Sequence, residues 1–96
     1  MKCVAHRLAE RDLIDAIAYY EQQAPGLGAE FLTAFEEALA LIQRHPAGAP
    51  SVRGQIRRLV MPRFPYNILY RRASDCIRIL AVAHQRRSQG YWADRM

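Results

Sequence analysis

A short segment near the end of the chain combines side chains that can transfer protons and bind phosphate. It holds His84, Arg86, Arg87 and Tyr91, and Arg78 lies shortly before it. When a ribose 2′-hydroxyl attacks the adjacent phosphate, the reaction needs a proton acceptor, a proton donor and cations for the charged transition state. His84 can be the base or the acid, the arginines can be the cations, and Tyr91 can assist. These residue types are common in basic proteins, so a structural role for His84 stays open.

Further arginines precede this segment and are expected on β-strands. Arg57 and Arg58 fall on one predicted strand, and Arg71 and Arg72 close the next. Neighbouring strands stand about 5 Å apart, so arginines on one face of different strands can converge and hold a phosphate backbone. Aromatic side chains beside such a cluster can stack on unpaired bases. The aromatic candidates are Tyr66, Tyr70, Tyr91 and Trp92.

The net charge of +5 is distributed unevenly along the chain. Residues 1–50 carry four basic and seven acidic side chains, whereas residues 51–96 carry ten arginines, no lysine and two aspartates. Arginine suits planar, bidentate recognition of carboxylate or phosphate, while lysine mainly supplies charge. A generally solvated basic surface is the plainer interpretation, but polarisation this strong favours a negatively charged partner.

Length and composition limit the class of protein. A chain of 96 residues that is 51% hydrophobic and 24% charged is typical of one globular domain, here residues 1–96. No apolar run is long enough for a membrane span, and no signal-peptide core follows the N-terminus, so we expect a cytoplasmic protein with no membrane partner. Cys3 and Cys76 are then expected to be reduced. The scattered histidines lack metal-ligand spacing, and we expect neither a metal nor another cofactor.

The first half of the sequence predicts two helices. The first runs from about Leu8 to the break at Pro25-Gly26, and the second from about Gly28 to Arg44, before His45-Pro46. The short linker predicts an antiparallel hairpin, with Asp12 and Asp15 on its solvated face. The apolar stripes are Leu13, Ile17 and Tyr20 on the first helix and Leu32, Phe35, Leu39 and Ile42 on the second, widened by Phe31, Ala34, Ala38 and Leu41.

The remaining segments predict a small sheet. Residues 2–5 form a short first strand, residues 46–54 form a loop, and strands follow at 56–61, 64–71 and 76–83. In the last strand Ile77, Ile79, Ala81 and Ala83 would face one way and Arg78, Leu80, Val82 and His84 the other, and a strand apolar on both faces is usually central. The order β-α-α-β-β-β predicts an α+β fold, with a helical hairpin packed on one face of a mainly antiparallel sheet. The opposite face and residues 85–96 would carry most of the arginines.

Four pieces of sequence, in order, cover nearly the whole chain and carry a resemblance to a known family. They are Arg11-Asp12-Leu13 with Ala18-Tyr19-Tyr20; Phe35-Glu36-Glu37-Ala38-Leu39 with Ile42 and Pro46; Phe64-Pro65-Tyr66 with Ile68-Leu69-Tyr70; and Ile77 to Arg87 with Tyr91-Trp92. Together they resemble the ParE/RelE superfamily of type II toxin–antitoxin toxins. The fold of that family is also β-α-α-β-β-β, in agreement with the expected order of elements.

The resemblance implies a cognate antitoxin as partner in a hetero-oligomer. The disordered C-terminal part of such an antitoxin folds onto the toxin, across the helical hairpin and the sheet. Ordering a segment of this kind costs several kcal/mol, so extensive burial is needed. The positions expected to contact the antitoxin are Leu13, Ile17, Tyr20, Phe31, Phe35 and Arg71.

The superfamily divides by target, since the RelE-like branch cuts mRNA on the ribosome and the ParE-like branch poisons DNA gyrase. In the ribonuclease branch a catalytic arginine commonly follows the third-strand tyrosine, whereas Asn67 follows Tyr66 here. The basic residue expected after the fourth strand aligns near Gln85. The Phe64-Pro65-Tyr66 and His84-x-Arg86-Arg87 patterns therefore favour the ParE-like branch.

We therefore expect a non-enzymatic gyrase inhibitor that an antitoxin neutralises. A ribosome-dependent endoribonuclease using His84, Arg86, Arg87 and Tyr91 is the alternative, and a degenerate toxin that only binds its antitoxin is a second alternative. The residues expected to contact the target are Arg57, Arg58, Arg78, His84, Arg86, Arg87, Tyr91 and Trp92.

Overall fold

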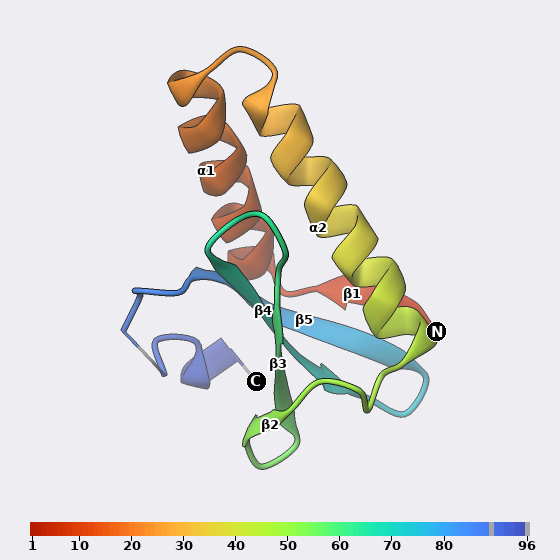
Figure 1. The fold of residues 1–96 in the computed structure, drawn as a ribbon. Coiled ribbons are helices and arrows are strands. Elements are labelled where there is room, and N and C mark those ends of the chain that lie inside the picture. The colour runs from red at the N-terminus through yellow and green to blue at the C-terminus, as the bar shows by residue number, and fades with distance from the viewer. Residues whose placement is uncertain (89, 96) are drawn as a thin grey trace.

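Two antiparallel helices lean on one face of a five-stranded sheet, and the C-terminal segment crosses the other face (Figure 1). This computed structural model describes residues 1–88 and 90–95, so Gln89 and Met96 of the predicted C-terminal segment lie outside the described residues. The predicted α+β fold is confirmed, and in the described part neither helix is long and apolar enough to cross a membrane. The elements are β1 (Lys2–Ala5), α1 (Arg7–Gln23), α2 (Leu27–Arg44), β2 (Ser51–Arg53), β3 (Ile56–Val60), β4 (Tyr66–Arg72), β5 (Cys76–His84) and the short 3₁₀ helix η1 (Ala93–Arg95).

The strands lie in the order β1-β5-β4-β3-β2, with β1 parallel to β5 and the others antiparallel. The prediction that the last strand is central is confirmed. The prediction of a loop over 46–54 is wrong at its end, because β2 pairs with β3 through Ser51↔Arg57 and Arg53↔Ile56. β2 has only three residues between Pro50 and Gly54, and so short a strand leaves no period-two pattern to detect.

The helical hairpin is held together by close approach of α1 and α2 at Gly28. A Cβ atom at Gly28 would lie 2.8 Å from the Ile17 carbonyl oxygen, so only glycine lets the helices meet here. The Glu21 carboxylate, at the end of α1, accepts hydrogen bonds from the backbone N–H groups of Gly26 and Gly28. These bonds satisfy free N–H groups at the start of α2 and fix the hairpin turn.

The core between hairpin and sheet is built from the inner faces of α1 and α2. An aromatic cluster joins the hairpin to the β3–β4 connection, since the Tyr20 ring lies 4.9 Å from Phe64 and 5.3 Å from Phe31. The predicted stripe on α2 is displaced, because Leu32 and Leu41 are exposed and two alanines occupy the contact with the rest of the core. The buried residues of α2 are Gly28, Phe31, Ala34, Phe35, Ala38 and Ile42.

A β-bulge in β5 divides the apolar side chains between two faces of the sheet. Tyr70 pairs with Ile79 but Leu69 pairs with Ala81, so Leu80 is an extra residue on β5. The expected strict alternation along this strand is therefore wrong: Val82 packs with the helices, while Ala81 faces the other side. The second apolar cluster, on the face away from the helices, consists of Ile56, Leu69, Leu80, Ala81, Ala83 and Trp92.

Candidate functional site

The C-terminal segment forms a second layer over the face of the sheet that the helices leave open (Figure 1). Its anchor is Trp92, which is only 6% exposed and completes the second apolar cluster. The Arg53 guanidinium lies 5.4 Å from the centre of the Trp92 ring. Trp92 was expected to contact the target, but its side chain is almost wholly buried in this cluster. Trp92 packs there on an apolar patch of the sheet, in which the bulge places Ala81 and Ala83 beside Leu80, Ile56 and Leu69.

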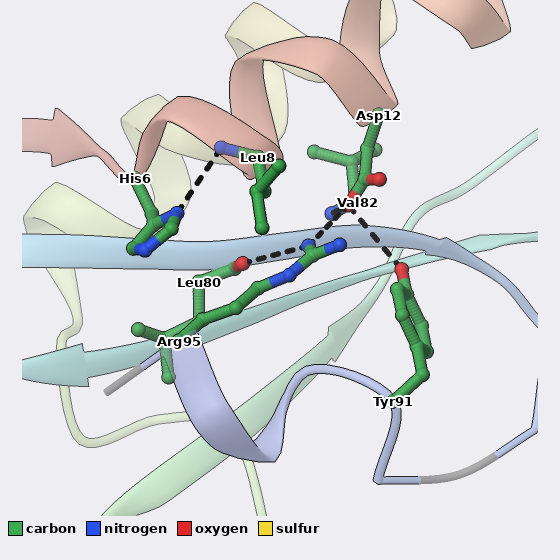
Figure 2. A network of polar contacts seen from close by, with 7 residues as sticks. All are labelled: His6, Leu8, Asp12, Leu80, Val82, Tyr91 and Arg95. Atoms are coloured by element: carbon green, nitrogen blue, oxygen red, sulfur yellow. Dashed lines mark hydrogen bonds and ion pairs between the residues drawn. The ribbon is translucent and has the colours of Figure 1, made fainter.

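A carboxylate on α1 clasps this segment to the sheet, as Figure 2 shows. One oxygen of Asp12, Oδ2, accepts hydrogen bonds from Arg95 Nη1 at 2.7 Å, from the Val82 backbone N–H at 3.1 Å and from the Tyr91 hydroxyl at 3.3 Å. The side chains of Arg95 and Asp12 are 8% and 13% exposed. The expectation that Asp12 lies on a solvated helix face is therefore wrong, whereas Asp15 is 69% exposed.

The clasp, formed by Asp12 with Val82, Tyr91 and Arg95, lies where strand β5 is no longer paired with β1. The pairing of β1 with β5 ends at Ala5↔Ile79, so β5 continues beyond that point as an edge on this side. Asp12 binds the Val82 N–H there, and Arg95 Nη1 donates to the Leu80 carbonyl oxygen at 3.1 Å. An unpaired buried backbone group is unfavourable by about 1–3 kcal/mol, so two side chains replace the missing strand.

Tyr91 is held between two guanidinium groups. The Arg87 and Arg95 side chains lie 4.0 and 4.8 Å from the centre of its ring. Burial, and secondarily the nearby Asp12 carboxylate, raise the pKa of Tyr91 from 10.0 to about 12. The hydroxyl therefore keeps its proton near neutral pH and donates a hydrogen bond to Asp12. A phenol with this pKa is a poor proton acceptor or donor for catalysis near pH 7.

A small cavity of about 50 Å³ lies between the C-terminal segment and strands β3 to β5. It brings together Arg58, His84, Arg87 and Tyr91, which the sequence placed in the target-binding set, and adds Asn67. The space suits a water molecule rather than a nucleotide. The buried Asn67 Oδ1 has no hydrogen-bond partner among the described residues, and a buried acceptor of this kind calls for a donor from solvent or a ligand.

His84 ends β5 at the border between the cavity and the helical hairpin. Its ring lies edge-on to Tyr66 at 5.2 Å, and its Nδ1 accepts a hydrogen bond from the Arg86 backbone N–H at 3.0 Å. In the neutral ring this bond leaves the proton on Nε2. Arg86 and Arg87 follow in an exposed turn. The site thus places the Arg86 and Arg87 cations at the surface, next to His84 at the end of β5.

Two further arginines face each other across the sheet. Arg71 of β4 and Arg78 of β5 are direct cross-strand partners, and neither side chain has an acidic partner within the described residues. Like charges directly opposite each other destabilise a sheet, so this pair is unfavourable in the folded chain itself.

The remaining predicted site residues do not join the cavity. Arg57 Nη1 donates to the Ala49 carbonyl oxygen at 2.7 Å, and Arg78 lies towards the other end of β5. Phe31 and Phe35, expected to contact an antitoxin, are buried, and the other hydrophobic residues of that set are partly buried against the same core. The apolar stripe of a helix shows which face is buried but not what buries it, and here the sheet of the same chain packs on that face. The exposed large hydrophobic residues of the two helices are Ile14, Tyr19, Leu32 and Leu41.

Asp12 and Arg95 were not predicted as site residues. A signal for Asp12 was present, because it lies three residues after Ala9 and four before Ala16, which are the buried residues of α1. No local pattern marks Arg95, whose partner lies at the other end of the chain. Within residues 1–88 and 90–95, no three His, Cys, Asp or Glu side chains come together as a metal site would require.

Comparisons with known proteins agree with this geometry. A family model described as the ParE toxin of the type II toxin–antitoxin system parDE matches residues 4–89. A solved structure titled "Chromosomal ParDE TA system from P. aeruginosa" has the same fold, with a TM-score of 0.78 and 24% sequence identity over 88% of this chain and 95% of that chain. No curated protein sequence matches this chain.

The clasp predicts that Asp12→Asn is strongly destabilising. The substitution leaves the Arg95 charge buried without its partner, so we expect the free energy of unfolding to fall by about 3 kcal/mol. Urea unfolding followed by circular dichroism measures the change. Asp15→Asn, on the same helix but exposed, is the control and should change stability by less than about 0.5 kcal/mol. Equal effects of the two substitutions would show that the clasp contributes little.

The raised pKa of Tyr91 predicts a loss of stability at alkaline pH. Between its ordinary pKa of 10.0 and about 12, the folded chain holds a proton that the unfolded chain releases, so stability present below pH 10.0 falls as pH rises. Urea unfolding at about pH 8 and about pH 11 should show a smaller loss for Tyr91→Phe than for the wild type. The exposed Tyr19→Phe variant should keep the wild-type loss, and an equal loss in Tyr91→Phe would contradict the assignment.

Proposed function

The chain belongs to the ParE toxin family of type II toxin–antitoxin systems, and from this we propose that it inhibits DNA gyrase until a cognate antitoxin neutralises it. The observation that carries the proposal is the chemistry of the basic sheet face. Its cations are presented at the surface, but the Tyr91 proton is committed to Asp12. Such a face can bind an anionic surface and has no assembled proton-transfer pair.

The position of Asn67 also supports binding over RNA cleavage. In the ribonuclease branch of the superfamily, an arginine commonly stands at this position after the tyrosine of the same strand. Asn67 provides an amide in the cavity wall instead of a positive charge for a phosphate transition state. Arg58 and Arg87 remain beside it as binding groups.

We place the target contact at the exposed turn that follows β5 and at the cavity rim beside it. Arg87 is oriented there by its contact with the Tyr91 ring, so its guanidinium loses less conformational freedom on binding than an unsupported side chain would. Arg86 is exposed in the same turn. The two arginines thus present charge from a segment that the clasp holds in place.

We propose that the antitoxin relies mainly on side chains outside the apolar stripes of the two helices. Leu13, Ile17, Tyr20, Phe31 and Phe35 form or adjoin the core between hairpin and sheet. An antitoxin that binds this folded conformation contacts exposed groups instead. Of the six residues expected to contact it, Arg71 is polar and only partly buried, beside Arg78 on the basic face.

Gyrase inhibition can be tested with purified protein. Free toxin, added to gyrase, ATP and relaxed plasmid, is expected to block supercoiling and to trap cleaved DNA. Arg87→Ala should weaken inhibition about tenfold, the loss of one charge-assisted contact worth about 1.5 kcal/mol. Arg11→Ala, on the exposed side of α1, is the matched control and should inhibit like the wild type.

Other outcomes of this experiment separate the alternatives. Gyrase that works normally, together with transcripts cut inside translated regions after induction, would establish the endoribonuclease instead. Unaffected gyrase, intact transcripts and normal growth in the absence of antitoxin would indicate a degenerate toxin.

Because Arg71 and Arg78 lie opposite each other, we predict that an acidic residue in place of Arg78 makes the protein more stable and less inhibitory. Arg78→Glu places opposite charges across the β4–β5 pair, so the free energy of unfolding should rise by about 0.2–1 kcal/mol. The same change should weaken gyrase inhibition, because the anionic target then meets a carboxylate. Denaturant unfolding and the supercoiling assay measure the two effects. A variant that is both less stable and less inhibitory would indicate a structural role for Arg78.

A further inference from the structure

The register of the sheet divides its arginines between two faces. Tyr70, Ile77 and Ile79 belong to the core beneath the helices. Successive side chains of a strand point to opposite faces. Arg71 of β4 and Arg78 of β5 therefore point to the face that the helices leave open, which we call the outer face (Figure 1).

Three further arginines reach the outer face. Arg58 of β3 lines the cavity between the strands and the C-terminal segment. Arg53 and Arg87 lie against the Trp92 and Tyr91 rings of that segment, 5.4 and 4.0 Å from the ring centres. These contacts restrict the two guanidinium groups before any partner binds, which lowers the entropy lost on binding. We call the whole set the outer arginines: Arg53, Arg58, Arg71, Arg78 and Arg87.

The outer arginines form no ion pair within residues 1–88 and 90–95. None of the five strands contains an aspartate or glutamate. The Asp12 carboxylate is bound in the clasp, Asp75 and Asp94 are exposed, and the other acidic residues lie on the two helices, in the opposite layer. The fold therefore leaves the repulsion between Arg71 and Arg78 uncompensated, and an anion that lies over both would relieve it.

The surface around these cations suits nucleic acid better than protein. A protein interface has an apolar core, but the apolar centre of the outer face is already covered by Trp92 of the same chain. The exposed large hydrophobic residues of the described strands are single ones, Val52 on β2 and Val60 at the end of β3. Protein–DNA interfaces are more polar and much more positively charged than protein–protein interfaces.

The aromatic side chains of this face favour a duplex over a single strand. Proteins bind single strands by stacking bases on open aromatic rings. Here Trp92 is only 6% exposed, and the Tyr91 ring is held between the guanidinium groups of Arg87 and Arg95. The outer face thus offers cations for phosphates but no free ring for a base.

We propose that the outer arginines bind the phosphate backbone of duplex DNA directly. A duplex carries one negative charge for about every 1.7 Å of its axis, so arginines on neighbouring strands meet several phosphates at once. Contacts of this kind hold a protein on DNA without reading its sequence. The binding needs no gyrase, so it goes beyond the inhibition proposed above and stands or falls separately from it.

Neighbouring arginines on opposite faces of the sheet provide a test with matched charge. Arg57 and Arg72 pair with Tyr70 and Ile77 of the helix-side core, so they lie on the face opposite to Arg58 and Arg71. The outer double variant is Arg58→Gln with Arg71→Gln, and the control is Arg57→Gln with Arg72→Gln. The two have the same composition and the same net charge.

Fluorescence anisotropy of a short labelled duplex, titrated with free toxin at several salt concentrations, measures the binding. The logarithm of the binding constant should fall with the logarithm of salt with a slope of about −4 in the wild type, and the outer double variant should lose about two units of that slope. At about 0.1 M salt the outer double variant should bind at least about tenfold more weakly, and the control less than about threefold.

Folding of the variants is checked by urea unfolding. Arg57 donates a hydrogen bond to the Ala49 carbonyl oxygen, so its replacement can destabilise the control. Arg71→Gln and Arg72→Gln as single variants then make the same comparison, because the Arg72 side chain is exposed and forms no ion pair within the described residues. Only Arg71→Gln should lower the salt slope, by about one unit.

Each other outcome has a definite meaning. Equal weakening by both double variants would show attraction by net charge alone and overturn the site. Tighter binding of a single strand of the same length would overturn the preference for a duplex, and displacement of the duplex by polyglutamate at equal charge would favour an acidic protein. Gyrase inhibition without duplex binding overturns this inference alone. Duplex binding without gyrase inhibition supports it and contradicts the function proposed above.

Discussion

The Asp12 carboxylate is the interaction on which the arrangement of this protein depends. Asp12 lies on α1, and its side chain binds both the unpaired edge of β5 and the C-terminal segment. The hydrogen bond from Arg95, at 2.7 Å, has the length of a charge-assisted bond, and the loss of either partner would leave a buried charge unpaired, which is costly. The clasp therefore orders residues that would otherwise be a loose tail, and it gives Arg87 a fixed support in the Tyr91 ring.

The bulge in β5 decides which side chains the C-terminal segment covers. By adding Leu80 to the strand, it turns Ala81 and Ala83 away from the helices and Val82 towards them, and the small sheet has an apolar cluster on each face. A helical hairpin can cover only one of them. The other is covered by the C-terminal segment, in which Trp92 packs on the cluster and Arg95 forms an ion pair with Asp12. The basic face is consequently a rim of arginines around a covered apolar centre, not a flat sheet of exposed charge.

The sequence predicted the features that depend on neighbours along the chain, and missed those that depend on distant ones. The spacing of apolar residues predicted α1 and α2, and the turn residues predicted where the main strands end, because both patterns depend only on residues close together in the sequence. The extra residue Leu80 leaves no trace in composition, so the facing of Ala81 and Val82 could not be read. Arg95 and Asp12 are 83 positions apart, and their pairing follows from the fold alone. Trp92 was expected to stack on a base, because its residue type alone does not tell whether its ring is exposed or buried.

The buried and the exposed charged side chains of this protein respond differently to salt. The shortest ion pair of the described residues, between Arg95 and Asp12, is buried, while the other pairs lie in solvent. Salt screens exposed charges over about 8 Å at physiological ionic strength and screens buried pairs much less. Rising salt should thus weaken the attraction of the exposed arginines for the proposed acidic partners before it weakens the clasp. The buried pair that holds the C-terminal segment is thus insulated from salt, whereas the exposed arginines are not.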